Sequence, residues 1–301
     1  MADAAHTIGH VKDSTYFEVP NLFGAASESG HGAGPQPLRV DLPQPFQLDK
    51  PILGVSSDPN AVFEPFDLRL TKFMVVELVA GILMCVIFIR LAQKMRQSQS
   101  PKGRFWNMFE AMVMFVRNDI ARSAIGKADG DKFVPFLLTM FFFILFCNLM
   151  GMLPWSGTPT AALGTTGVLA LSTFAVVVGS ASAKMGFGGF LRSQVPHMDL
   201  PGPMGFFLKP MIFVLEIGGM LIKHFVLSVR LLANMFAGHL VLAVILGFCI
   251  QVSGMLWFGV VPASILGAVA LSLLELLVAF IQAYIFAFLS ALFIGLAIHP
   301  H

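Results

Sequence analysis

The chain has 301 residues, of which 56% are hydrophobic and only 12% charged, and its mean hydropathy is +0.79. This composition excludes an ordinary soluble domain and indicates an integral membrane protein. The net charge of +2, with basic residues spread along the chain, argues against a nucleic-acid partner. The three cysteines lie far apart in apolar segments without metal-ligand spacing, so we expect buried hydrophobic residues, no metal site and no cofactor.

Residues 1–66 are rich in Pro, Gly and Ser, which predicts little regular structure. The first residues also lack the charged start and apolar core of a cleavable signal peptide. We therefore expect a solvated N-terminal tail, followed by a membrane domain over residues 67–301 whose first spanning helix directs sorting.

The membrane domain begins with an apolar stretch at residues 73–91, which is long enough to span a bilayer. Residues 104–120 then place aromatic and aliphatic side chains at helical spacing among charged ones. This pattern predicts an amphipathic helix on the membrane surface. The short GFGGF segment at residues 186–190 is expected to be a loop, because no strand or following lysine suggests a phosphate site.

Four further apolar stretches, residues 133–155, 165–183, 211–250 and 257–298, complete an all-α protein with about five spanning helices. The last two have about 40 residues each, or roughly 60 Å as helices, against a hydrocarbon core of roughly 30 Å. We therefore predict that they form a hairpin of long, tilted helices.

The distribution of basic residues predicts the orientation in the membrane. Residues 1–72 hold five basic and nine acidic residues, whereas residues 93–132 hold eight basic and four acidic ones. Because basic residues favour the cytoplasmic side, the tail is expected outside and residues 93–132 inside. Five spans then leave the C-terminus in the cytoplasm.

Arg230 lies in the apolar run at residues 225–237 and is the most informative residue of the chain. An arginine does not lose its proton in a low-dielectric site, so at membrane depth it needs a partner or a function. Asn234 is one helical turn away, and Lys223 and Glu216 fall within about 40° of Arg230 on the same helix. These residues predict a polar lane roughly 21 Å long. For Lys223 we favour a side chain that extends to the cytoplasmic interface over one that lines a channel.

His239 points to the opposite side of that helix, which suggests two separate polar lanes near one cation. In the last helix Glu275 and Gln282 share a face, with Tyr284 on a different one. Antiparallel packing would pair His239 with Glu275, and Arg230 with Gln282. A histidine and a glutamate in contact can exchange a proton near neutral pH.

Three segments carry a resemblance to a known family. SVRLLANMFAGHL and LLELLVAFIQAYIFAFL resemble the two signature helices of the a subunit of F-type ATP synthases, and NLMGMLP, from Asn148 to Pro154, resembles a third family motif. The likeness extends from about Phe133 to the C-terminus in order and spacing.

The resemblance implies a proton-translocating stator subunit that packs against a rotating ring of c subunits and works with b-type stalk subunits and the rest of the complex. Arg230 would face the ring carboxylate and separate two half-channels. The other implied channel residues are Asn234, His239, Glu275 and Gln282 on the external side and Glu216 on the cytoplasmic side. Asn148, Lys223 and Tyr284 are further candidates for channel-lining or structural roles.

The chain has no P-loop, so it is not expected to make or split ATP itself; catalysis would belong to partner subunits. Its expected location is a bacterial inner membrane. A Na⁺-translocating version of the same subunit remains an alternative. A secondary transporter is a rival class, although no inverted repeat is found. An intramembrane hydrolase would need a catalytic motif that the sequence lacks.

Overall fold

The computed structural model describes residues 14–19, 38–44, 70–97, 103–153, 157–193, 204–252 and 254–299. Within these ranges five helices are long and apolar enough to cross a membrane, which confirms the predicted all-α integral membrane fold. These helices are α2 (Lys72–Gln97), α5 (Lys127–Gly151), α6 (Leu163–Met185), α8 (Met204–Gln251) and α9 (Trp257–Ile298).

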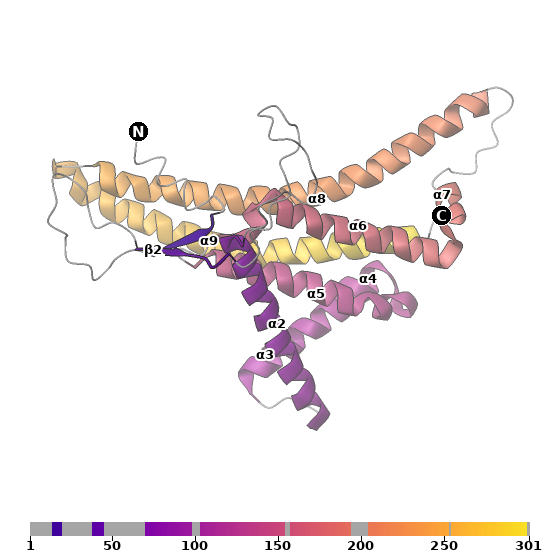
Figure 1. Ribbon diagram of the computed structural model, residues 1–301, viewed down its shortest axis with the longest axis horizontal. Helices are drawn as coiled ribbons and strands as arrows, with labels where there is room; N and C mark the ends of the chain where they lie inside the picture. Colours follow the sequence, from indigo (N-terminus) through magenta and orange to yellow (C-terminus); the bar gives the residue numbers. More distant parts are fainter. Residues whose placement is uncertain are drawn as a thin grey trace.

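The last two helices form the predicted hairpin. The 48 residues of α8 and the 42 of α9 correspond to about 72 and 63 Å of helix, which is at least twice the thickness of a hydrocarbon core. The 3₁₀ turn η3 (Gly254–Leu256) lies between them. Figure 1 shows α8 and α9 side by side along the longest axis of the molecule, with α5 and α6 beside them and α2 crossing steeply.

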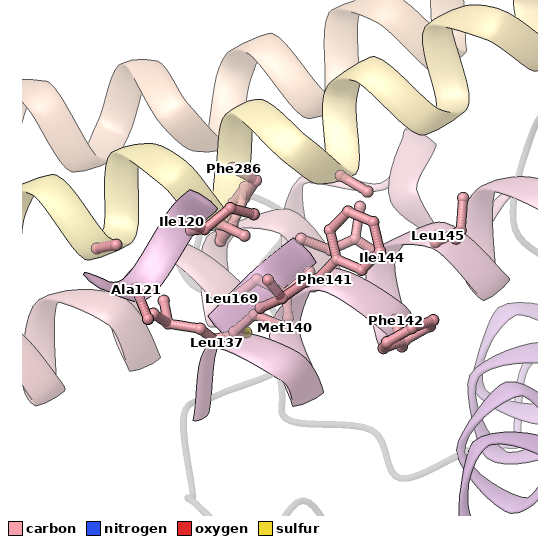
Figure 2. Packing of buried hydrophobic residues seen from close by; sticks show 14 of the residues in the cluster. Ile120, Ala121, Leu137, Met140, Phe141, Phe142, Ile144, Leu145, Leu169 and Phe286 are labelled. Atoms are coloured by element: carbon pink, nitrogen blue, oxygen red, sulfur yellow. The ribbon is translucent and has the colours of Figure 1, made fainter. Parts of the chain in front are cut away.

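The core lies where α5 packs between α9 and the segment before it. Phe142, Ile144 and Leu137 of α5 are fully buried, and Phe286 of α9 and Ile120 lie in the same cluster (Figure 2). Because α5 is almost entirely apolar on all sides from Phe133 onward, this part can be buried on several sides at once. This packing fixes α9, and with it the α8–α9 hairpin, against the rest of the bundle.

The predicted amphipathic helix is present but irregular. It consists of α3 (Arg104–Phe115), a π-helical turn η1 (Val116–Ala121) and the short α4 (Arg122–Ala124). Phe109 and Ile120 are buried on the bundle, while Phe105 and Met108 are exposed. One side of the segment therefore packs on protein and the other is free to face a membrane surface.

Ion pairs gather at one end of the bundle. Asp131 accepts hydrogen bonds from Arg117, at 3.2 and 3.0 Å, and from Arg122, at 2.9 and 2.8 Å. The hydrogen bonds from Arg122 to Asp131 raise the pKa of the Arg122 guanidinium above its ordinary value. Asp129 pairs with Lys132, at 2.9 Å, with Lys184, at 3.3 Å, and with His299, at 3.7 Å. The start of α5, the end of α6 and the end of α9 therefore meet at one end of the bundle, as Figure 1 shows.

Some local expectations need correction. The GFGGF segment is not a loop, because Phe187–Ser193 forms helix α7. Cys147 is buried as expected, but Cys85 is exposed and Cys249 is half-buried, since their sides of α2 and α8 are not covered by protein. Within the N-terminal segment, β1 (Tyr16–Val19) and β2 (Leu38–Asp41) pair antiparallel. Residues 1–13, 20–37 and 45–66 lie outside the described residues.

Gly295 allows α9 to touch the backbone of α4. A Cβ added at Gly295 would collide with the carbonyl oxygen of Ala124 and would lie 3.3 Å from the Cα of Ile125. We expect Gly295→Ala to destabilise the protein by about 1–3 kcal/mol, because backbone atoms must move. Gly259→Ala, in the same helix with nothing within 4 Å, is the matched control. Thermal inactivation of the purified protein in detergent would measure both, and equal stability of the two variants would contradict the expectation.

Candidate functional site

His239 of α8 and Glu275 of α9 face each other across the hairpin. Their Nε2 and Oε1 atoms are 3.7 Å apart, as antiparallel packing of the two helices predicts. Glu275 is only 5% exposed, and its Oε1 has no hydrogen-bond partner among the described residues. A small movement of the imidazole would bring Nε2 within hydrogen-bonding distance of this oxygen. The pair can therefore pass a proton from one side chain to the other.

Gly238 makes room for this pair. A Cβ at Gly238 would lie 2.9 Å from Glu275 Oε1 and 3.2 Å from its Cδ, distances too short for unstrained contact. The glycine therefore lets the carboxyl group lie directly against α8. Periodicity did not single out this residue, because a glycine has no side chain to assign to a face; only its place beside His239 could have suggested a role.

We expect Gly238→Ala to lower proton conduction by displacing the Glu275 carboxyl group from His239. The change adds one methyl group and also favours helix formation. Gly247→Ala, in the same helix with nothing within 4 Å, makes the same chemical change without a collision. Proton flux through vesicles carrying the assembled complex would compare them. Equal flux in the two variants would show that the close approach at residue 238 has no functional consequence.

Thr158 also contacts His239 and was not predicted. It lies between α5 and the 3₁₀ turn η2 (Pro159–Ala161), and its hydroxyl is hydrogen-bonded to His239 Nε2. A single uncharged threonine in a connecting segment carries no pattern that would distinguish it from its neighbours. The structure adds it to the site by bringing this segment against α8.

Asn234 and Gln282 form a second contact between α8 and α9. Asn234 Nδ2 donates to Gln282 Oε1 over 2.8 Å, and Gln282 is 1% exposed. The expected partner of Gln282 was Arg230, so the structure shifts this pairing by one helical turn. Because Arg230 and Asn234 lie on one face of α8, the difference is one of position along the helix axis: Gln282 lies level with Asn234 and one turn away from Arg230.

Arg230 is half-buried and has no hydrogen bond or ion pair within the part of the chain that the structure describes. Exposed apolar side chains lie near it along α8; they include Val226, Val229 and Phe236. A permanent cation among apolar groups is costly in a membrane unless an anion approaches it. The hairpin therefore presents an unpaired guanidinium on an uncovered face.

The remaining predicted residues divide into two groups. Glu216 and Lys223 are exposed on α8, without a partner among the described residues. Asn148 is buried and accepts a hydrogen bond from Thr160 over 2.7 Å, and Tyr284 stacks on Phe288 with ring centroids 5.8 Å apart. Asn148 and Tyr284 thus have structural contacts, whereas the other two are free.

His224 is a buried histidine outside these contacts. Its Nδ1 lies 2.8 Å from the carbonyl oxygen of Met220, and its ring lies between those of Phe174 and Phe293. Burial and the Met220 contact place it in the packing between α6, α8 and α9. Among the described residues no group of three His, Cys, Asp or Glu side chains could hold a metal ion.

Comparison with known proteins identifies the family. The family model described as ATP synthase A chain matches residues 74–295, which is most of the chain and includes the whole candidate site. The chain belongs to the ATP synthase a subunit family. Membership establishes an ion-translocating subunit of the membrane sector, a multi-pass membrane protein that works with other ATP synthase subunits.

Relatives named ATP synthase subunit a support this family over long alignments. The Myxococcus xanthus protein is 40% identical over 238 residues, covering 78% of this chain and 76% of the relative. The Chloroherpeton thalassium protein is 39% identical, covering 84% and 73% respectively. An Anaeromyxobacter relative is 36% identical over 302 residues, covering 97% and 70%.

Proposed function

We propose that this a subunit conducts protons through two half-channels that meet at Arg230, where the guanidinium faces a carboxylate of a rotating c ring. The observation that carries the proposal is the unpaired, half-buried Arg230 on the uncovered apolar face of the α8–α9 hairpin. In this account the carboxylate of the passing ring subunit supplies the anion that the described residues do not supply.

The charge of Arg230 explains how rotation would follow proton flow. A fixed cation lowers the pKa of a carboxylate brought close to it, whereas apolar surroundings raise that pKa. A ring carboxyl group would therefore lose its proton beside Arg230 and hold a proton while facing lipid. Because each charge crossing the membrane is worth about 2.3 kcal/mol per 100 mV, several protons are needed for each ATP.

The external half-channel in this proposal uses the two contacts between α8 and α9. His239 and Glu275 would exchange protons with the external solution, and Asn234 and Gln282 would lie between that pair and Arg230. Glu216 would serve the cytoplasmic half-channel, since it lies along α8 on the other side of Arg230 and its side chain is exposed. Lys223 would extend toward the cytoplasmic interface.

The same proposal assigns partners and orientation. The uncovered face of the hairpin would pack on the c ring, and b-type stalk subunits would hold the a subunit still. The N-terminus would lie outside and the C-terminus inside, in a bacterial inner membrane. The ion pairs that join Asp129 to Lys184 and His299 support this orientation, because they bring the start of α5, the end of α6 and the end of α9 to the same end of the bundle.

The choice of ion is testable with the whole complex reconstituted in vesicles. A pH gradient imposed in sodium-free buffer should drive ATP synthesis at a rate that added Na⁺ does not raise. Synthesis that requires Na⁺ would instead establish the sodium-translocating version. Failure of the chain to assemble with a c ring would remove the rotary account and favour a secondary transporter.

A further inference from the structure

We propose that Thr158 is a positioning residue of the external half-channel, whose hydroxyl holds the His239 ring beside Glu275. The inference rests on the proposed function of the His239–Glu275 pair. It concerns a residue that lies outside both signature helices, in the connection between α5 and α6.

The contacts of one nitrogen atom carry the inference. His239 Nε2 is hydrogen-bonded to the Thr158 hydroxyl, and the same nitrogen lies 3.7 Å from Glu275 Oε1. That carboxyl oxygen has no hydrogen-bond partner among the described residues. Nε2 therefore has two oxygens near it, of which the threonine oxygen is bonded and the glutamate oxygen is free to receive a proton.

The surrounding backbone keeps the threonine in place. Thr158 is 2% exposed, and a Cβ on Gly151 would lie 2.6 Å from its Cγ2 and 2.7 Å from its Cβ. The glycine at the end of α5 thus leaves the space that Thr158 fills. On the other side, Ala161 N donates to the Thr158 carbonyl oxygen over 2.9 Å, and Thr160 is bonded to Asn148. The turn that follows Thr158 is therefore closed by its own backbone hydrogen bond and anchored to α5 through Asn148.

A hydroxyl suits this position because it both donates and accepts hydrogen bonds. When the ring is neutral with a lone pair on Nε2, the threonine O–H donates to it. When the ring is protonated, Nε2–H donates to Oγ1. For transfer to Glu275 a small movement of the imidazole turns Nε2–H toward Oε1; the Nε2–H bond breaks, an O–H bond forms on Oε1, and the threonine hydroxyl then rotates to donate to the returning ring. The threonine therefore holds the ring before and after the transfer, which needs no additional reactant.

Two substitutions separate the hydroxyl from the shape of the side chain. Thr158→Val keeps the shape and removes the hydroxyl, whereas Thr158→Ser keeps the hydroxyl. In inverted vesicles carrying the assembled complex, we expect Thr158→Val to lower ATP-driven proton pumping about tenfold, the effect of losing one hydrogen bond worth roughly 1–1.5 kcal/mol. Thr158→Ser should pump within about twofold of the native protein, a rescue that a purely structural role would not give.

The outcomes distinguish this inference from the proposed function. If His239→Ala blocks pumping while Thr158→Val pumps normally, Thr158 is not a positioning residue and the channel account stands. If His239→Ala itself pumps normally, the proposed role of the His239–Glu275 pair is wrong, and Thr158 has no proton-transferring pair to position. Equal losses in Thr158→Val and Thr158→Ser would mean packing rather than hydrogen bonding, which also overturns the inference. If the valine variant does not assemble, Thr158→Ala replaces it, since it only removes atoms.

Discussion

Replacing Arg230 by Ala is expected to abolish ATP synthesis by the whole complex. The side chain has no described partner in the isolated subunit, so its removal should leave the fold intact and delete only the cation on the hairpin face. Without that cation a ring carboxyl group has no site at which loss of its proton is favoured, and nothing separates the two half-channels. Synthesis driven by an imposed proton gradient should fall to background.

Arg192→Ala provides the control for the loss of a guanidinium. Arg192 is exposed at the end of α7 and has no partner in the described part of the chain. This variant should synthesise ATP at the native rate. An Arg230→Ala complex that assembles and also synthesises at the native rate would show that the arginine has no part in coupling.

The second large effect is expected at the His239–Glu275 pair. Loss of a positioned acid or base typically costs roughly 10²–10⁴-fold, and we expect His239→Ala and Glu275→Gln each to lower passive proton flux by about 10²-fold. The buried position of Glu275 leaves little room for water to replace it. Exchanging the two residues, His239→Glu with Glu275→His, should recover part of the flux, because an imidazole and a carboxyl group again occupy the two facing positions.

Flux should be measured in membranes stripped of the catalytic sector, so that only the membrane sector is tested. Ser272→Ala is a suitable control one turn from Glu275, since among the described residues its hydroxyl bonds only to the carbonyl oxygen of Ala268 in its own helix. Native flux in both single variants, with native c-ring assembly, would remove the pair from the proton pathway.

Apolar length and helical spacing were sufficient to predict the helices and the main pair. Long apolar runs leave few alternatives to membrane-spanning helices, because every backbone polar group must be bonded within the segment. The meeting of His239 with Glu275 follows from a short turn and antiparallel packing. These features depend on sequence spacing alone, which is why the structure reproduces them.

Other parts of the site depend on contacts that spacing does not encode. Asn234, rather than Arg230, bonds Gln282, because the position of α8 along α9 is set by packing against several helices. Gly238 and Gly151 matter through the space they leave, and Thr158 matters through the path of a connecting segment. The π-helical turn at Val116–Ala121 likewise has no simple sequence pattern. The contacts of Asn234 with Gln282, Gly238 with Glu275 and Thr158 with His239 require the relative placement of segments far apart in the sequence.

The most direct test of the account is ATP-driven proton uptake by inverted vesicles that carry the whole complex, with native Arg230 or Arg230→Ala. The account predicts strong uptake by the native complex and none by the variant, with equal amounts of assembled complex in the two membranes. Uptake by the assembled variant at the native rate would contradict the claim that protons pass from one half-channel to the other by way of a ring carboxylate facing Arg230.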